Sequence, residues 1–335
     1  MGNYADASAC QLFISWIGYH GRSDDLAKSL GARDVYITGG AGNRVARYIK
    51  QWRETTRIVR HERPEAVFVM QPPVVALWAT YLSAPRSSAI IADLHTGVFT
   101  DPKWKWAAKW ILRAQRRRGD AVIVTNESLA ATCRNLNVTT FVLDDAVPRR
   151  VGEAKARVDA VSLESLSADD FVLVPLAYAA DEPLGEILAA AAQDPDRTWV
   201  LTGKAPASIR ANASRNVLFS GFVSRDDYDW LAAHAGVVLA CTIEENTMQR
   251  AGYEAVSWER PLVTTRTQVL VDYFAEAAVF ADPNAGSVLG AIHDAFSRRA
   301  ELIGAMSELG ARKRGAYETA IRDVRDYLSR TRGAR

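Results

Sequence analysis

A carboxylate and an imidazole stand two residues apart at Asp93 and His95, directly after an apolar run that predicts a strand. In an extended segment, residues spaced by two point to the same side. Either group could take the proton from a hydroxyl as a general base, and His95 could instead orient the hydroxyl or hydrogen-bond a sugar. We interpret Asp93 and His95 as candidate catalytic residues. The alternative is an aspartate that caps a loop beside a satisfied polar histidine.

A second polar segment follows the apolar run 237–241 and precedes a predicted helix, 249–258. Backbone N–H groups at a helix start can hold phosphate oxygens, and an arginine there can add charge-assisted hydrogen bonds without a metal. A glutamate farther into the helix could accept hydrogen bonds from ribose or sugar hydroxyls. This arrangement indicates a nucleotide-sugar enzyme; surface glutamates beside a helix cap are the alternative. The candidate donor-binding residues here are Glu245, Asn246, Thr247, Met248, Gln249, Arg250 and Glu254.

Three more candidate donor-binding residues follow other predicted strands of the same half. Lys204 could pair with a diphosphate as a point charge, and Phe222 with Val223 could hold a nucleobase. A surface lysine and a core phenylalanine are the alternatives. Other phosphate sites fit poorly, because no GxGxxG spacing occurs after the early strands and Gly203-Lys204 lacks the remainder of a P-loop. NAD and P-loop chemistry are therefore disfavoured.

The loop after the first predicted strand is rich in glycine and carries basic side chains. We interpret it as a flexible loop that contacts an acceptor, while an ordinary turn between strand and helix is the alternative. A phenylalanine soon after His95 is assigned to the same role. The candidate acceptor-binding residues are Gly18, Tyr19, His20, Arg22 and Phe99.

The segment Lys103–Arg118 contains seven basic residues, three tryptophans and no acid. A basic helix with interfacial tryptophans can lie on an anionic membrane surface. A solvated helix whose tryptophans pack on its own domain is an equal alternative. Interleaved aromatic and basic residues also occur in proteins that bind single-stranded nucleic acid. One such helix is weak evidence for that function, so nucleic acid is not a favoured partner.

The chain has 335 residues, and 48% of them are hydrophobic. This length and composition indicate a globular protein with one large domain or two domains of ordinary size. The cysteines Cys10, Cys133 and Cys241 are far apart, which argues against a disulfide framework or a zinc site and suits a reducing cytoplasm. We expect no signal peptide, and no metal or cofactor.

Residues 1–150 hold 21 Lys/Arg and 13 Asp/Glu, and residues 151–335 hold 20 and 26. The basic first half suits phosphates, an anionic surface or nucleic acid, or a complementary interface with the acidic second half.

Strand and helix patterns alternate along the whole chain, and the series restarts after a polar segment, 149–168. Two such series predict two doubly wound α/β domains facing a cleft. We place the first domain at 1–150 and the second at 168–312. A last helical segment, 313–335, is expected to pack back on the first domain.

Several of these motifs together resemble the two-Rossmann (GT-B) glycosyltransferases, in particular bacterial polysaccharide-type enzymes of the "group 1" superfamily. The resemblance rests on Glu254-Ala255-Val256 with Pro261-Leu262-Val263, and it extends to segments 18–30, 71–73, 93–99, 124–127, 181–183 and 201–203. It implies that Glu254 binds the ribose, that 247–250 touch diphosphate and sugar, that Phe222 and Val223 flank the base, and that His95 lies by the reacting sugar. The sequence departs from the pattern at Asn246, where a glutamate is usual, and at 175–179, which lack the usual Arg and Lys.

The expected function is metal-independent glycosyl transfer from a UDP-, GDP- or dTDP-sugar to a saccharide or lipid-linked acceptor. The expected location is the cytoplasm, with the inner face of the membrane as a candidate site of peripheral attachment. A GT-B sugar-nucleotide epimerase or hydrolase is one alternative, and a non-catalytic partner subunit is another. A DNA-modifying transferase is supported only by the basic first half.

Overall fold

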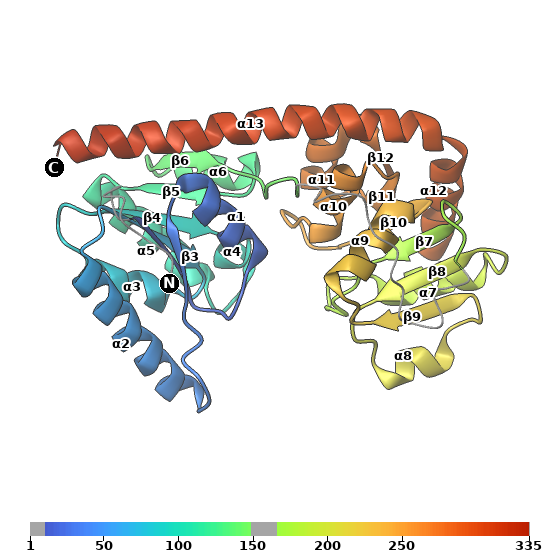
Figure 1. Cartoon of the computed structure of the whole chain (residues 1–335), viewed down its shortest axis with the longest axis horizontal. Helices are drawn as coiled ribbons and strands as arrows, with labels where there is room; N and C mark the ends of the chain where they lie inside the picture. The colour runs from blue at the N-terminus through green and yellow to red at the C-terminus, as the bar shows by residue number, and fades with distance from the viewer. Residues whose placement is uncertain (1–10, 149–165, 335) are drawn as a thin grey trace. The chain divides into compact units, whose positions relative to one another are not determined.

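The computed structural model describes residues 11–148 and 166–334, and Figure 1 traces the chain. Its contacts form two compact units: unit 1 is Met1–Ala146 with Ala316–Arg335, and unit 2 is Val147–Gly315. Cys10 and most of the expected linker, 149–165, lie outside the described residues. Cys133 and Cys241 are buried and unpaired.

Unit 1 is built on a parallel sheet of six strands in the order β2-β1-β3-β4-β5-β6. Its elements are β1 (Gln11–Ser15), α1 (Gly21–Leu30), β2 (Arg33–Tyr36), α2 (Arg44–Glu62), β3 (Ala66–Gln71), α3 (Val74–Ser83), β4 (Ala89–Leu94), α4 (Gly97–Thr100), α5 (Lys105–Arg118), β5 (Ala121–Val124), α6 (Glu127–Arg134) and β6 (Thr139–Val142). The strand order reverses between β1 and β3. At such a switch point, the loops beyond the carboxyl ends of the strands are the usual ligand site.

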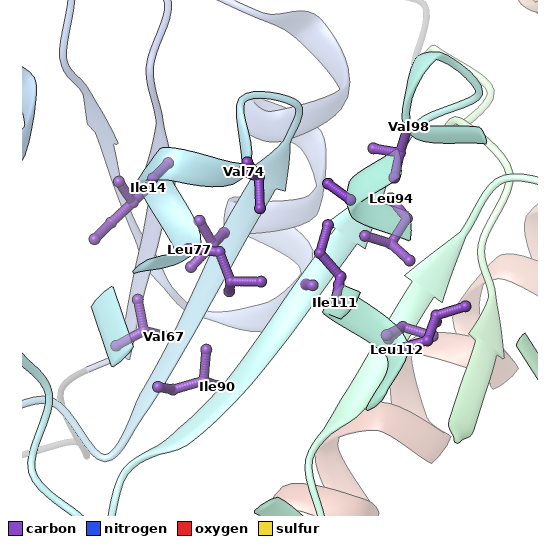
Figure 2. Packing of buried hydrophobic residues seen from close by; sticks show 14 of the residues in the cluster. Ile14, Val67, Val74, Leu77, Ile90, Leu94, Val98, Ile111 and Leu112 are labelled. Carbon is purple, nitrogen blue, oxygen red and sulfur yellow. The ribbon is translucent and has the colours of Figure 1, made fainter. Parts of the chain in front are cut away.

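Two apolar layers cover the two faces of this sheet. Figure 2 shows one layer, in which Leu77 of α3 and Ile111 of α5 belong to one cluster with strand residues such as Val67 and Leu94. The other layer combines α1 with the last helix, α13 (Arg299–Ala334), through residues such as Val324. Both layers follow from strands that are apolar on both faces, as in other parallel sheets.

Unit 2 contains a second parallel sheet of six strands, in the order β12-β11-β10-β7-β8-β9. Its elements are β7 (Phe171–Val174), α7 (Leu184–Ala192), β8 (Thr198–Thr202), α8 (Ala207–Asn212), β9 (Val217–Gly221), α9 (Arg225–His234), β10 (Val237–Ala240), α10 (Arg250–Trp258), β11 (Leu262–Thr265), α11 (Gln268–Phe274), the 3₁₀ turn η1 (Ala275–Ala277), β12 (Ala278–Ala281) and α12 (Ala285–Ser297). The order reverses between β7 and β10. The second switch point is therefore at the loops after these two strands.

Polar side chains define several helix starts. Asn43, Asn126, Ser224 and Asn284 each accept a hydrogen bond from a backbone N–H in the first turn of their helix. Asp101 closes a turn, because its side chain accepts from the N–H of Lys103 at 2.8 Å. The basic helix α5 consequently begins at Lys105, after this turn.

The predicted α/β class is confirmed, since both sheets are wholly parallel and each is covered by helices. None of the helices in the described segments combines the length and apolar character needed to cross a membrane.

Candidate active site

Asp93 lies at the end of β4 and is held by a buried arginine of α1. The Arg22 Nη2 atom is 3.0 Å from Asp93 Oδ1, and Nε is 3.3 and 3.4 Å from the two carboxylate oxygens. Exposed fractions are 0% for Asp93 and 3% for Arg22. Burial by itself would raise the pKa of Asp93, but the charges of Arg22 and His95 override it and hold that pKa well below its usual range. Asp93 is therefore ionised and enclosed, a setting that does not suit the general base that the sequence suggested.

His95 hydrogen-bonds to the same carboxylate and is the more accessible of the two. Its Nε2 atom is 3.0 Å from Asp93 Oδ2. Because an ionised carboxylate can only accept, Nε2 carries the proton in this contact. When Nε2 alone is protonated, Nδ1 is the ring nitrogen whose lone pair can accept a proton.

A second histidine stands next to His95. The rings of His20 and His95 are 5.1 Å apart and edge to face, and His20 Nδ1 is 3.2 Å from Ser23 Oγ. Burial lowers the pKa of His20, and the nearby His95 lowers it further. His20 is thus neutral near pH 7, which leaves its ring able both to donate and to accept a hydrogen bond.

The other candidate acceptor-binding residues differ in burial and in the groups that they contact. The guanidinium of Arg22, a predicted acceptor residue, is buried and is also bound to Leu143 O at 2.8 Å and Asp145 at 2.9 Å. Gly18 and Tyr19 are exposed in the loop after β1, and the rings of Tyr19 and Tyr36 are 5.8 Å apart and tilted by 45°. Phe99 of α4 is partly buried and packs on the core of unit 1.

In unit 2, two loops at the switch point are joined by a pair of acidic residues. Glu182 accepts from the N–H groups of Ala177 at 3.0 Å and Ala179 at 2.9 Å, and from Gln249 Nε2 at 3.3 Å. Asp181 accepts from Thr242 Oγ1 at 2.7 Å. The loop after β7 is thereby fixed to the segment that leads into α10.

Glu254 lies inside α10 and is 7% exposed. The Tyr228 hydroxyl of α9 donates to its Oε2 at 2.5 Å, and Arg250 Nε is 3.7 Å from its Oε1. Burial raises the pKa of Glu254, while Tyr228 and Arg250 oppose that shift. The structure therefore brings Gln249, Arg250 and Glu254 together, with Gln249 as the residue that precedes the helix.

The remaining donor candidates are spread along the same edge of this sheet. Glu245 accepts from the N–H of Gln268 at 3.3 Å, at the start of α11. Met248 and Val223 are partly buried against the core of unit 2. Asn246 and Thr247 are half-buried in the loop before α10, whereas Lys204 after β8 and Phe222 after β9 are exposed. Phe222 is 84% exposed, so it is not a core residue.

Sequence reasoning missed Glu182 and Tyr228 as parts of this site. Asp181-Glu182 follows a buried strand and directly precedes Pro183. The helix starts only at Leu184. Two acidic residues between a strand end and a proline could have indicated a loop; for Tyr228, no local signal exists.

Comparison with known proteins adds information on the fold alone. No protein-family model and no curated protein sequence matches the chain. Among solved structures, HepE of Anabaena in complex with UDP and glucose superposes with a TM-score of 0.69 at 14% identity, covering 96% of this chain and 100% of that chain. The chain has the GT-B fold.

Other GT-B structures are similar. A glycosyltransferase from Rickettsia africae has a TM-score of 0.67 at 12% identity, covering 97% of this chain and 99% of that one. A UDP-GlcNAc 2-epimerase from Methanocaldococcus jannaschii has a TM-score of 0.57 at 11% identity, covering 85% and 91%. Both transferases and epimerases therefore use this fold, and the predicted likeness to GT-B proteins is confirmed.

The described residues, 11–148 and 166–334, contain no group of three His, Cys, Asp or Glu side chains that could hold a metal ion.

Proposed function

We propose that this GT-B protein is a glycosyltransferase that moves a sugar from a nucleotide-diphosphate sugar to a saccharide or lipid-linked acceptor, without a metal. The observation that carries the proposal is the 3.0 Å contact between His95 Nε2 and the buried, ionised Asp93. It orients the imidazole beyond the carboxyl end of β4, where the strand order of unit 1 brings ligand-binding loops together.

In the proposed reaction, His95 Nδ1 takes the proton of an acceptor hydroxyl. The hydroxyl oxygen attacks the anomeric carbon of the sugar, and the bond from that carbon to the diphosphate oxygen breaks. Asp93 stabilises the imidazolium that forms, as a positioning residue. The nucleoside diphosphate leaves with the displaced electron pair.

On the donor side, the proposed site is the start of α10 in unit 2. Its first N–H groups and Arg250 would meet the charge of the diphosphate. Glu254 would accept hydrogen bonds from the ribose, and Tyr228 would orient that carboxylate. Bound UDP in similar structures such as HepE supports a nucleotide donor of this class.

The test is calorimetry of the full chain with UDP, GDP and dTDP, followed by an assay for transfer. Binding of one nucleotide at micromolar affinity is expected. If none binds, the donor assignment fails. Release of free nucleotide or an isomerised sugar without any acceptor would favour the hydrolase or epimerase alternative, which the similarity to 2-epimerases keeps as the second candidate. The proposed role is in polysaccharide biosynthesis in the cytoplasm, at the inner face of the membrane.

A further inference from the structure

The helices α3 and α5 each turn one face into the core of unit 1 and the other outward. In Figure 2, Val74 and Leu77 of α3 and Ile111 and Leu112 of α5 are among the core side chains. The outward side of α5 therefore carries the side chains of this helix that are not part of the core. Its exposed residues are Lys105, Trp106, Lys109, Trp110, Arg113, Arg116 and Arg117.

Three tryptophans form a cluster across the two helices. The ring of Trp78 in α3 is 6.3 Å from that of Trp106 and 5.4 Å from that of Trp110. Trp106 is 58% exposed and Trp110 is 38% exposed. Leu82, at the end of α3, is 71% exposed. Large apolar side chains gathered in this way on a protein surface mark an interaction site.

The charged side chains of α3 and α5 are all of one sign. Between Asp101 and Asp120 the sequence contains no acidic residue. Asp120 is buried and pairs with Arg118 at 2.7 Å. Lys105, Lys109 and Arg113 make no ion pair with any residue in the described segments, so their charges face solvent.

We propose that the face formed by α3 and α5 docks on an anionic phospholipid bilayer. Tryptophan and leucine side chains enter the boundary between headgroups and acyl chains, and lysine and arginine beside them attract acidic headgroups. Exposed Leu82 gives a bilayer an apolar contact that a nucleic acid would not use. The Trp106 indole N–H already donates to Lys103 O at 2.8 Å, which fixes this ring at the surface. The proposal does not depend on the donor chemistry.

The test uses the full chain and vesicles of phosphatidylcholine, with or without phosphatidylglycerol. Wild type is expected to float with the anionic vesicles and to stay in solution with the neutral ones. Changing Lys105, Lys109 and Arg113 to glutamine should weaken binding about a hundredfold, from the typical contribution of each basic residue at an anionic surface. A matched control replaces Arg312, Arg322 and Arg330 of α13 by glutamine, and should bind within a few-fold of wild type.

A second pair of variants tests the aromatic part. Brominated lipids should quench tryptophan fluorescence in the wild type, and Trp106→Ser with Trp110→Ser should remove most of that quenching while the thermal unfolding temperature stays close to wild type. The proposal fails if wild type does not bind anionic vesicles. It also fails if vesicle binding by the α13 control is weakened as much as that by the α5 variant. Salt-dependent retention on DNA without vesicle binding would assign the face to nucleic acid and would also overturn it. Each of these results is independent of whether a nucleotide binds in calorimetry.

Discussion

Arg22 and Asp93 form a buried ion pair in which Nη2 and Oδ1 are 3.0 Å apart, although 71 residues separate them in sequence. The same guanidinium binds Asp145 and the carbonyl of Leu143, beyond β6. One side chain thus ties the start of α1 to the end of β4 and to the segment that follows β6. The carboxylate that orients His95 is fixed by this network.

Replacing Arg22 by leucine should leave Asp93 buried without a partner charge. We expect a loss of about 3–5 kcal/mol in the free energy of unfolding, measured in urea. The control is Arg57→Gln, which breaks an exposed pair with Glu54 and should change little. An Arg22 variant as stable as this control would contradict the buried network.

Lowering the pH should remove the contribution of Asp93 to the free energy of unfolding, over the pH range that its lowered pKa defines. Its folded-state pKa lies below the unfolded value, so the stabilisation is complete above the unfolded pKa of about 3.9 and is lost as pH falls from there towards the folded value. The difference in unfolding free energy between wild type and Asp93→Asn should therefore be constant near neutral pH and shrink below about pH 4. A difference that grows on acidification would show that Asp93 is not held ionised.

His95→Ala should abolish most transfer and leave nucleotide binding unchanged. A positioned general base typically contributes about 10²–10⁴-fold to the rate, so kcat should fall by this range. His61→Ala on the exposed end of α2 is the matched control and should keep full activity. Because a base-assisted direct attack inverts the anomeric carbon, NMR of the product should show inversion. A retained configuration would make His95 a contact of the donor sugar instead of the base.

Tyr228→Phe should weaken nucleotide binding through Glu254. The change removes one hydrogen bond to a buried carboxylate, which is typically worth about 1.5–3 kcal/mol, and only part of this is expected to appear in Kd. Glu254→Ala should weaken binding more, since it removes the ribose contact itself. The control is Tyr317→Phe, which also removes a tyrosine hydroxyl, here one that donates to Ser29 in unit 1. The Kd of this variant for the nucleotide should equal that of wild type. Unchanged binding in both the Tyr228 and Glu254 variants would remove the ribose role from Glu254.

The strands were predictable because parallel strands that are covered on both faces need continuous apolar runs. Residues 171–174 and 237–240 are such runs, and both are central, buried strands. Helix starts were less predictable. The Asp101-Pro102 pair has the composition of a helix start, yet backbone hydrogen bonds from Trp104 and Lys105 to Asp101 O close a turn there.

The site was predictable where it depends on local geometry. Asp93 and His95 share a side because they are two residues apart, and their contact follows from that spacing. The pairing of Tyr228 with Glu254 joins α9 to α10, and that of Arg22 with Asp93 joins α1 to β4. Such contacts depend on how helices pack on strands, and for that reason no spacing in the sequence indicated that Arg22 is buried.

The core of unit 1 is completed by a segment that follows unit 2 in the sequence. Ile321, Val324 and Leu328 of α13 pack with Phe13 and Phe68 of the sheet, while all of unit 2 lies between them in sequence. On the ribosome, one apolar face of the first sheet must therefore wait, covered only in part by α1, until the whole of unit 2 has emerged. Unit 2 can complete its own fold in that interval, so a chaperone that shields the first sheet would act before α13 is released.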